Sequence, residues 1–305
     1  MKPEEITAYM SDCTLCPRHC HADRSAGKAG YCGAGAALSA ARAALHFWEE
    51  PCISGTAGSG AIFFSGCNLK CVFCQNHSIA AGLTGRDISV ERLCDLFFEL
   101  EQKGAVNINL VTAGHFLPQV VCALELAGQK GLSIPVVYNT GSYEEVSSLR
   151  LLEGLVDIWL PDLKYVSPEL SVKYSFAPDY FEKASAAIAE MVRQAGPPQI
   201  DEATGLMKRG VIVRHLVLPG QVKDSKKVLR YLHETYGNQI YISIMNQYTP
   251  LPHVEGIPEL NRRVTAEEYD RVVRFAERLG IVQGFIQEGE TAKESFIPDF
   301  NCEGL

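Results

Sequence analysis

The sequence has no long apolar run and no excess of basic residues. Nowhere do about 18 uncharged apolar residues follow one another, the length that a membrane-spanning helix needs. The first ten residues, MKPEEITAYM, contain no basic segment leading into an apolar one, as a secretory signal would. Lys and Arg number 28 against 36 Asp and Glu, giving a net charge of −8, whereas nucleic-acid surfaces depend on clustered basic residues. We therefore expect a cytoplasmic protein, with neither a membrane nor nucleic acid as its partner.

The eleven cysteines do not indicate a disulfide framework. A chain of 305 residues, 47% of them apolar, is long enough to bury an ordinary core without covalent cross-links. The number of cysteines is odd, and they cluster toward the N-terminus at short spacings. Such clustering is typical of metal ligation.

Three of these cysteines, Cys67, Cys71 and Cys74, stand at C-x3-C-x2-C spacing directly after a β-like run. Three thiolates can hold three irons of a [4Fe–4S] cluster and leave the fourth iron open to a ligand that is not protein. Structural zinc prefers four closed ligands, so it would need His77 or a distant residue as the fourth. The spacing therefore favours an iron–sulfur cluster with an open iron.

This motif, with the aromatic residue Phe73 before its last cysteine, resembles the radical S-adenosylmethionine (radical SAM) superfamily. The resemblance implies two cofactors, a [4Fe–4S] cluster and S-adenosylmethionine, the second bound to the open iron through its amino and carboxylate groups. It also implies one-electron reduction of the sulfonium, which gives methionine and a 5′-deoxyadenosyl radical that abstracts hydrogen from a substrate. An electron donor such as flavodoxin or ferredoxin is then the expected redox partner.

Apolar patterning predicts an α/β fold that follows a cysteine-rich segment. Short apolar runs alternate with longer amphipathic stretches, as in repeated βα units. The runs span residues 61–66, 106–112, 134–140, 156–164, 210–219, 240–248 and 283–288. Stretches 89–104 and 265–280 open with Ser or Thr and close on Gly, which predicts helices. We expect an open, partial (β/α)6 TIM-like barrel over residues 58–305, preceded by a small Cys-rich metal-binding extension over residues 1–57.

Charged residues at two predicted strand ends suit the carboxylate of S-adenosylmethionine. Ligands of parallel α/β folds gather where the strands end. Lys164 follows the fourth run and Arg214 lies in the fifth, and both can make charge-assisted bonds to the methionyl carboxylate. The D-x-K of Asp162 and Lys164, and Arg214 followed shortly by Pro-Gly, resemble the activating enzymes of glycyl radical enzymes, typified by the pyruvate formate-lyase activase. In that family these positions serve the cofactor.

Two other strand ends depart from the activase pattern. After the third run the family has D-T-x-G, where this chain has Asn139 and Thr140, so it lacks the acid that helps to hold a monovalent cation. After the second run the family has S-G-G-E. This chain supplies Thr112, Ala113 and Gly114, small residues that still let the backbone approach the cofactor.

Three further residues at the same end of the sheet have two interpretations each. Gln247 is a candidate for binding ribose or substrate, and strand termination also explains it. Phe73 either packs beneath the cluster loop or lies beside adenine. His115 stands where the family has an acid, and we interpret it as a loop histidine with a structural hydrogen bond.

A second cysteine group precedes the barrel at C-x2-C-x3-C-x11-C spacing, which can close a tetrahedral site. Its members are Cys13, Cys16, Cys20 and Cys32. The segment spans too few apolar residues to fold alone, so metal binding would supply its folding free energy. The spacing leaves zinc and an auxiliary iron–sulfur cluster both open. Zinc is slightly favoured, because His19 and His21 add nitrogen ligands.

The leading hypothesis is a radical SAM enzyme similar to the pyruvate formate-lyase activase. Its substrate stays open among a glycine or other residue of a partner protein, a peptide and a small metabolite. The alternative is a non-catalytic iron–sulfur redox sensor or electron carrier on the same fold, which would need no carboxylate site at Lys164 and Arg214. A third hypothesis is a zinc-dependent binding module, which metal analysis would identify.

Overall fold

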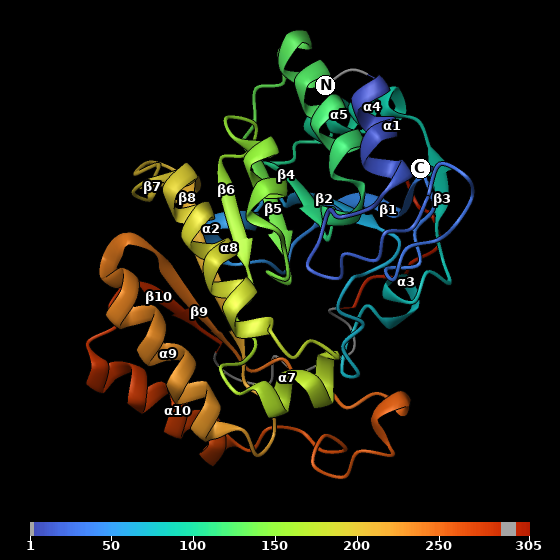
Figure 1. Cartoon of the computed structure of the whole chain (residues 1–305). Coiled ribbons are helices and arrows are strands. Elements are labelled where there is room, and N and C mark those ends of the chain that lie inside the picture. The colour runs from blue at the N-terminus through green and yellow to red at the C-terminus, as the bar shows by residue number, and fades with distance from the viewer. Residues whose placement is uncertain (1–2, 288–296) are drawn as a thin grey trace.

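Seven parallel strands form one curved sheet in the computed structural model, which describes residues 3–287 and 297–305 (Figure 1). They are β2 (Ser59–Phe64), β4 (Ile108–Val111), β5 (Val136–Thr140), β6 (Ile158–Pro161), β8 (Met207–Leu216), β9 (Tyr241–Met245) and β10 (Gly284–Ile286). Neighbours pair in the order β10–β9–β8–β6–β5–β4–β2, and every pair is parallel. The order has two ends, so the barrel stays open. The predicted partial TIM-like barrel is therefore confirmed.

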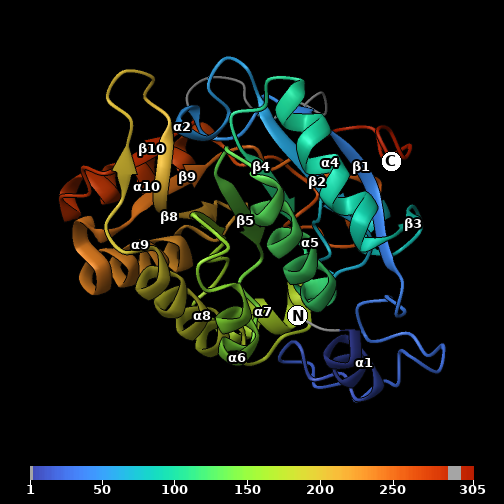
Figure 2. The same ribbon diagram turned by 90° about the horizontal axis from the view of Figure 1, so that it is seen from above.

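Helices cover the outer face of this sheet (Figure 2). They are α4 (Val90–Gln102), α5 (Leu117–Lys130), α6 (Val146–Leu149), α8 (Tyr180–Ala195), α9 (Val222–Tyr236) and α10 (Ala266–Leu279). Helix α7 (Pro168–Ser175) instead lies beyond the strand ends, where the Tyr174 carbonyl accepts from the Val72 N–H at 2.9 Å (Figure 1). Short 3-10 turns are η1 (Gly114–Phe116), η2 (Arg150–Leu152), η3 (Gly237–Gln239) and η4 (Pro252–Val254). Both predicted helices are present as α4 and α10. Ser89 caps α4, and Thr265 forms a reciprocal capping box with Glu268 at the start of α10.

The N-terminal segment contributes one strand to the sheet, and its first part lies outside the sheet. After α1 (Pro3–Ser11), strand β1 (Leu38–His46) pairs antiparallel with β2 and with β3 (Arg86–Ile88). Sequence patterning missed β1, β3 and β7 (Gln199–Ile200), which pairs antiparallel with β8. The first strand of the sheet begins at Leu38, inside the expected extension over residues 1–57. Only the part of that extension before Leu38 therefore precedes the sheet. Short α3 (His77–Ala80) follows the cysteine loop.

Helix α2 (Pro51–Ser54) closes the barrel at the amino ends of its strands. Cys52 and Ile53 pack inside the barrel against residues of β5, β6 and β8, namely Val137, Ile158, Leu160, Met207 and Ile212. The Asn107 side chain, just before β4, donates to the carbonyl of Ile53 at 2.7 Å. The barrel interior is therefore filled at this end and open to ligands at the other. No helix in the described part of the chain is long and apolar enough to cross a membrane.

Candidate functional site

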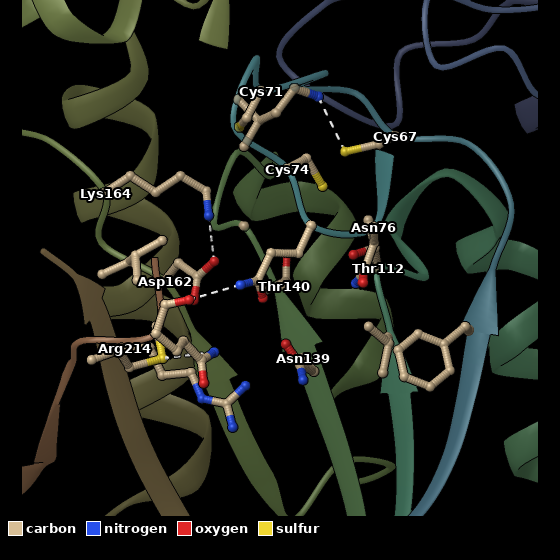
Figure 3. A pocket seen from close by; sticks show the side chains of 18 of the residues that line it. Cys67, Cys71, Cys74, Asn76, Thr112, Asn139, Thr140, Asp162, Lys164 and Arg214 are labelled. Carbon is tan, nitrogen blue, oxygen red and sulfur yellow. Dashed lines mark hydrogen bonds and ion pairs between the residues drawn. The ribbon is translucent and has the colours of Figure 1, made fainter. Parts of the chain in front are cut away.

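One pocket at the carboxyl ends of the parallel strands brings together most of the predicted site residues (Figure 3). Those that line it are Cys67, Cys71, Phe73, Cys74, Thr112, Asn139, Thr140, Asp162, Lys164, Arg214 and Gln247. Ala113 and Gly114 do not line it but lie buried behind it, where η1 begins. The pocket therefore gathers predicted residues that are up to 180 positions apart in the sequence, from Cys67 to Gln247.

Cys67, Cys71 and Cys74 lie on the loop after β2. The Cys74 N–H donates to the Cys71 carbonyl at 3.1 Å, and Ser175 Oγ donates to Cys71 Sγ at 3.0 Å. Burial raises the pKa of Cys74 to about 12, and the neighbouring Cys71 and Cys67 add to the rise. Metal binding must therefore displace thiol protons. Three sulfurs that converge on one pocket fit a cluster with three protein-bound irons.

Lys164 forms an ion pair with Asp162 on the pocket wall (Figure 3). The Tyr180 hydroxyl accepts from the Lys164 N–H and lies 3.0 Å from the carbonyls of Gly141 and Asp162, which fixes the chain at this strand end. Burial alone would lower the pKa of Lys164, but Asp162 and Cys71 outweigh it, and the pKa is raised. The pocket therefore holds an ammonium group beside Cys71.

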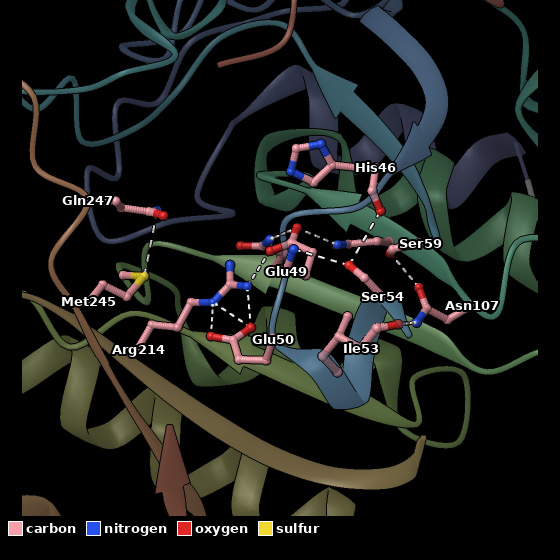
Figure 4. Close-up of polar contacts among 12 residues, drawn as sticks. His46, Glu49, Glu50, Ile53, Ser54, Ser59, Asn107, Arg214, Met245 and Gln247 are labelled. Carbon is pink, nitrogen blue, oxygen red and sulfur yellow. Dashed lines mark hydrogen bonds and ion pairs between the residues drawn. The ribbon is translucent and has the colours of Figure 1, made fainter. Parts of the chain in front are cut away.

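Arg214 lies deeper, where two carboxylates hold its guanidinium (Figure 4). Its Nε donates to Glu50 at 2.9 Å, and its Nη2 contacts both Glu49 and Glu50. Glu49 also accepts from the Asn109 amide at 2.9 Å and from the Asn139 amide at 3.5 Å. Two carboxylates against one guanidinium leave a net negative charge on the pocket floor. Such a floor suits a cationic ligand.

These contacts leave Arg214 less able to bind the methionyl carboxylate of S-adenosylmethionine. Sequence reasoning expected Arg214 and Lys164 to share the methionyl carboxylate, and it did not identify Glu49 or Glu50. In the structure Arg214 is paired with those two acids, while Lys164 is paired with one acid, Asp162, and stands next to Cys71. Lys164 is therefore the better placed of the two for an anionic group.

Phe73 packs against three tyrosines beneath the cysteine loop. Its ring is edge-on to Tyr165, Tyr174 and Tyr248, with ring centroids 6.4 to 6.5 Å apart. The ring is buried although the residue borders the pocket. These contacts support the interpretation that Phe73 packs beneath the cysteine loop over the interpretation that it lies beside adenine.

Gln247 connects the end of β9 to the cysteine loop. Its carbonyl accepts from the Gln75 side chain at 2.8 Å, and its side-chain oxygen accepts from Gln287 at 3.0 Å. The residue thus faces the pocket from a fixed position. It stays a candidate for binding ribose or substrate.

His115 is a structural residue. Its ring is buried, and Nε2 donates to the Ser65 carbonyl at 2.7 Å. Burial lowers the pKa of His115 to about 4, so the ring is neutral near pH 7. It does not line the pocket, in agreement with the interpretation as a loop histidine.

The N-terminal cysteines lie near one another outside the pocket. Cys13, Cys16 and Cys32 are buried, whereas Cys20 is exposed. A Cβ placed on Gly30 would lie 3.4 Å from the sulfurs of both Cys20 and Cys32. Two of the four thiols therefore face the same small space.

The two histidines beside Cys20 contact carboxylates. His19 Nε2 lies 3.1 Å from Glu145, and His21 Nδ1 lies 2.7 Å from Asp12. Within residues 3–287 and 297–305, no group of three or more His, Cys, Asp or Glu side chains is arranged to hold a metal ion. The N-terminal metal therefore stays a prediction, with thiols as its donors.

Glu144 should make the stability of the fold depend on pH. It is buried behind the pocket, where burial raises the pKa of its carboxyl from 4.5 to about 7 despite hydrogen bonds from Thr140 and Tyr138. An acid whose pKa rises on folding stabilises the fold below its unfolded pKa and loses that effect as the pH rises through the folded pKa. We expect ionisation of Glu144 to lower the free energy of unfolding by about 3 kcal/mol as the pH rises from about 4.5 to about 7.

The measurement is urea unfolding at several pH values, for wild type and Glu144→Gln. The variant should lose the downward slope in this range, because a neutral amide does not titrate. Parallel curves for the two proteins would contradict the assignment.

Comparison with known proteins adds three observations. The family model described as the radical SAM superfamily matches residues 61–232, more than half of the chain. The uncharacterized protein MJ0674 of Methanocaldococcus jannaschii is 27% identical over 290 residues, which cover 92% of this chain and 79% of that protein. A domain of pyruvate-formate lyase-activating enzyme from Bacteroides vulgatus is similar over 57% of this chain and 92% of its own, with 13% identity and a TM-score of 0.41.

A further similar structure is Streptococcus suis SuiB bound to the precursor peptide SuiA. The likeness covers 74% of this chain at 11% identity, with a TM-score of 0.50. The chain corresponds to about half of SuiB, 47% of its length. At this identity the likeness concerns the fold alone.

Proposed function

Because the chain belongs to the radical SAM superfamily, we propose that Cys67, Cys71 and Cys74 hold a [4Fe–4S] cluster and that the adjoining pocket holds S-adenosylmethionine. The observation that carries this proposal is the placement of the three thiols, Lys164 and Asp162 around one pocket. When bound and reduced, the cluster supplies one electron to the sulfonium, which yields methionine and a 5′-deoxyadenosyl radical that takes a hydrogen atom from the substrate.

The pocket residues would then position the cofactor. Lys164 binds the methionyl carboxylate, because it is the ammonium beside Cys71. The Thr112 hydroxyl and the side-chain oxygen of Asn139 lie among the pocket-lining groups and offer partners for the amino group and ribose, whereas the Thr140 hydroxyl donates to Glu144 behind the pocket. The negative floor formed with Glu49 favours the positively charged sulfonium.

Exposed aromatic surface supports a protein or peptide as the substrate. Trp48 lines the pocket and is 60% exposed, and its neighbour Phe47 is 48% exposed. Large exposed aromatic side chains at the rim of a site commonly contact another chain. A small metabolite would not need this rim.

The proposal is tested on anaerobically reconstituted protein with dithionite as reductant. We expect 5′-deoxyadenosine and methionine to form, and peptides from a proteolysed cell extract to speed their formation more than the small-metabolite fraction of that extract. Iron without any 5′-deoxyadenosine would favour the electron carrier. Zinc without iron would overturn the proposal.

Replacing Lys164 with methionine should weaken binding of S-adenosylmethionine. A hydrogen bond to a charged group contributes about 1.5–3 kcal/mol, so the dissociation constant should rise about tenfold to a hundredfold. Titration calorimetry on reconstituted protein of equal iron content measures it, and Lys164→Arg should restore part of the affinity. An unchanged dissociation constant would remove Lys164 from the cofactor site.

A further inference from the structure

A buried arginine stands next to the N-terminal cysteines without a carboxylate. Arg24 is completely buried, and in the described residues no Asp or Glu lies within ion-pair distance of it. Its guanidinium donates to the carbonyls of Gly35, at 2.6 and 3.0 Å, and His115, at 2.6 Å. Removing a charge from water costs several kcal/mol unless an opposite charge compensates it. These carbonyls and the ring of Phe116, whose centroid lies 5.5 Å from the guanidinium carbon, compensate only part of this cost, so an anion beside Arg24 would stabilise the fold.

The sulfur of Cys13 is the group that can supply this anion. It lies 3.8 Å from Nη1 of Arg24. The sulfurs of Cys20 and Cys32 share the space in front of Gly30, and Cys16 is buried in the same segment. Neutral thiols would not compensate a guanidinium, whereas thiolates bound to a metal would.

We propose that Cys13, Cys16, Cys20 and Cys32 bind a metal centre as thiolates, that Arg24 is its buried counter-cation, and that the centre fixes the loop carrying Cys67. Four thiolates on zinc, or on a [4Fe–4S] cluster, leave a net negative charge, and both centres are bound by the same sulfur ligands. Binding releases the thiol protons, so the charge that Arg24 faces forms when the metal enters.

The connection to the cluster loop is direct. The carbonyl of Cys32 accepts from the N–H of Cys67 at 3.1 Å. Arg18, between Cys16 and Cys20, donates to the carbonyl of Asn68 at 2.8 Å and also contacts that of Ser175. Ordering of the N-terminal segment by a metal would therefore order the loop after β2. This part of the inference rests on the proposed role of Cys67.

Metal analysis of the reconstituted full chain tests the centre. We expect about four irons for the pocket cluster together with either about four more irons or about one zinc. Cys20→Ala should lose only the second set, while Cys94→Ala, a core cysteine outside both groups, should lose none. Four irons and no zinc in wild type, or equal metal in all three proteins, would overturn the proposal.

Two glycines give a matched test of the space between the sulfurs. Neither Gly30 nor Gly35 has a left-handed backbone, so alanine strains neither. A methyl group at residue 30 would contact two sulfurs, whereas at residue 35 it would contact nothing within 4 Å. Gly30→Ala should therefore bind the second metal more weakly than wild type, and Gly35→Ala should bind it as wild type does. Equal binding of this metal by the two variants would contradict the site.

Substitution of Arg24 separates its charge from its packing. Arg24→Met should weaken the second metal about tenfold to a hundredfold in chelator competition, and Arg24→Lys should recover part of that loss. Equal weakening by both substitutions would mean that Arg24 acts through packing alone and would overturn its role as counter-cation.

The connection to the loop has its own readout. In Cys20→Ala, a chelator should remove iron from the pocket cluster about tenfold faster than in wild type. Equal rates would overturn the connection. Cys71→Ala should keep the second metal, since the two centres have different ligands. If wild type contained the second metal but formed no 5′-deoxyadenosine, the proposed function would be contradicted and the N-terminal centre would not.

Discussion

Cys71→Ala is expected to abolish formation of 5′-deoxyadenosine, a loss of about a thousandfold or more. Cys71 is buried beside the ammonium of Lys164 and accepts a hydrogen bond from Ser175, and alanine at this position offers no iron ligand. Two remaining cysteines would hold the cluster poorly. The assay is product formation under dithionite, with iron and sulfide measured on the same sample.

The matched control is Cys94→Ala, because both changes remove one sulfur from a buried site. The control should keep wild-type iron and wild-type activity. If Cys71→Ala retained both, the cluster could not lie on the loop after β2. Loss of activity with full iron content would instead place the fault in cofactor binding.

Arg214→Met is expected to lower the free energy of unfolding by about 3–5 kcal/mol. The substitution leaves the carboxylates of Glu49 and Glu50 buried without a cation. Burial alone would raise the pKa of Glu50, but Arg214 and hydrogen bonds outweigh it and lower the pKa. Glu50 therefore stabilises the fold above its ordinary pKa, and that contribution is lost as the pH falls.

A double variant separates charge from packing. Adding Glu50→Gln to Arg214→Met removes one uncompensated carboxylate and should return part of the lost stability. Urea unfolding of wild type, the two single variants and the double variant gives the coupling energy. Additive effects of the two substitutions would show that the pair does not interact.

Strands and helices were predictable where the pattern is local. All seven apolar runs contain parallel strands, because the inner strands of a parallel sheet are buried on both faces and read as continuous apolar segments; the exception is the edge strand β10, which is partly exposed. Ser89 and Thr265 marked their helices through hydrogen bonds within one turn. Strand β1 was missed because LSAARAALH has small residues and an arginine in place of β-branched ones.

The sequence by itself determined the C-x3-C-x2-C loop and the order of βα units, since ligand spacing and apolar periodicity are properties of neighbouring residues. Only the tertiary structure decided the partners of the buried charges. Arg214 meets Glu50 across 164 positions, and Arg24 meets His115 across 91. Such pairs depend on how the barrel curves and on where the segment before β2 crosses it. Spacing along the chain therefore does not reveal which residue is the partner.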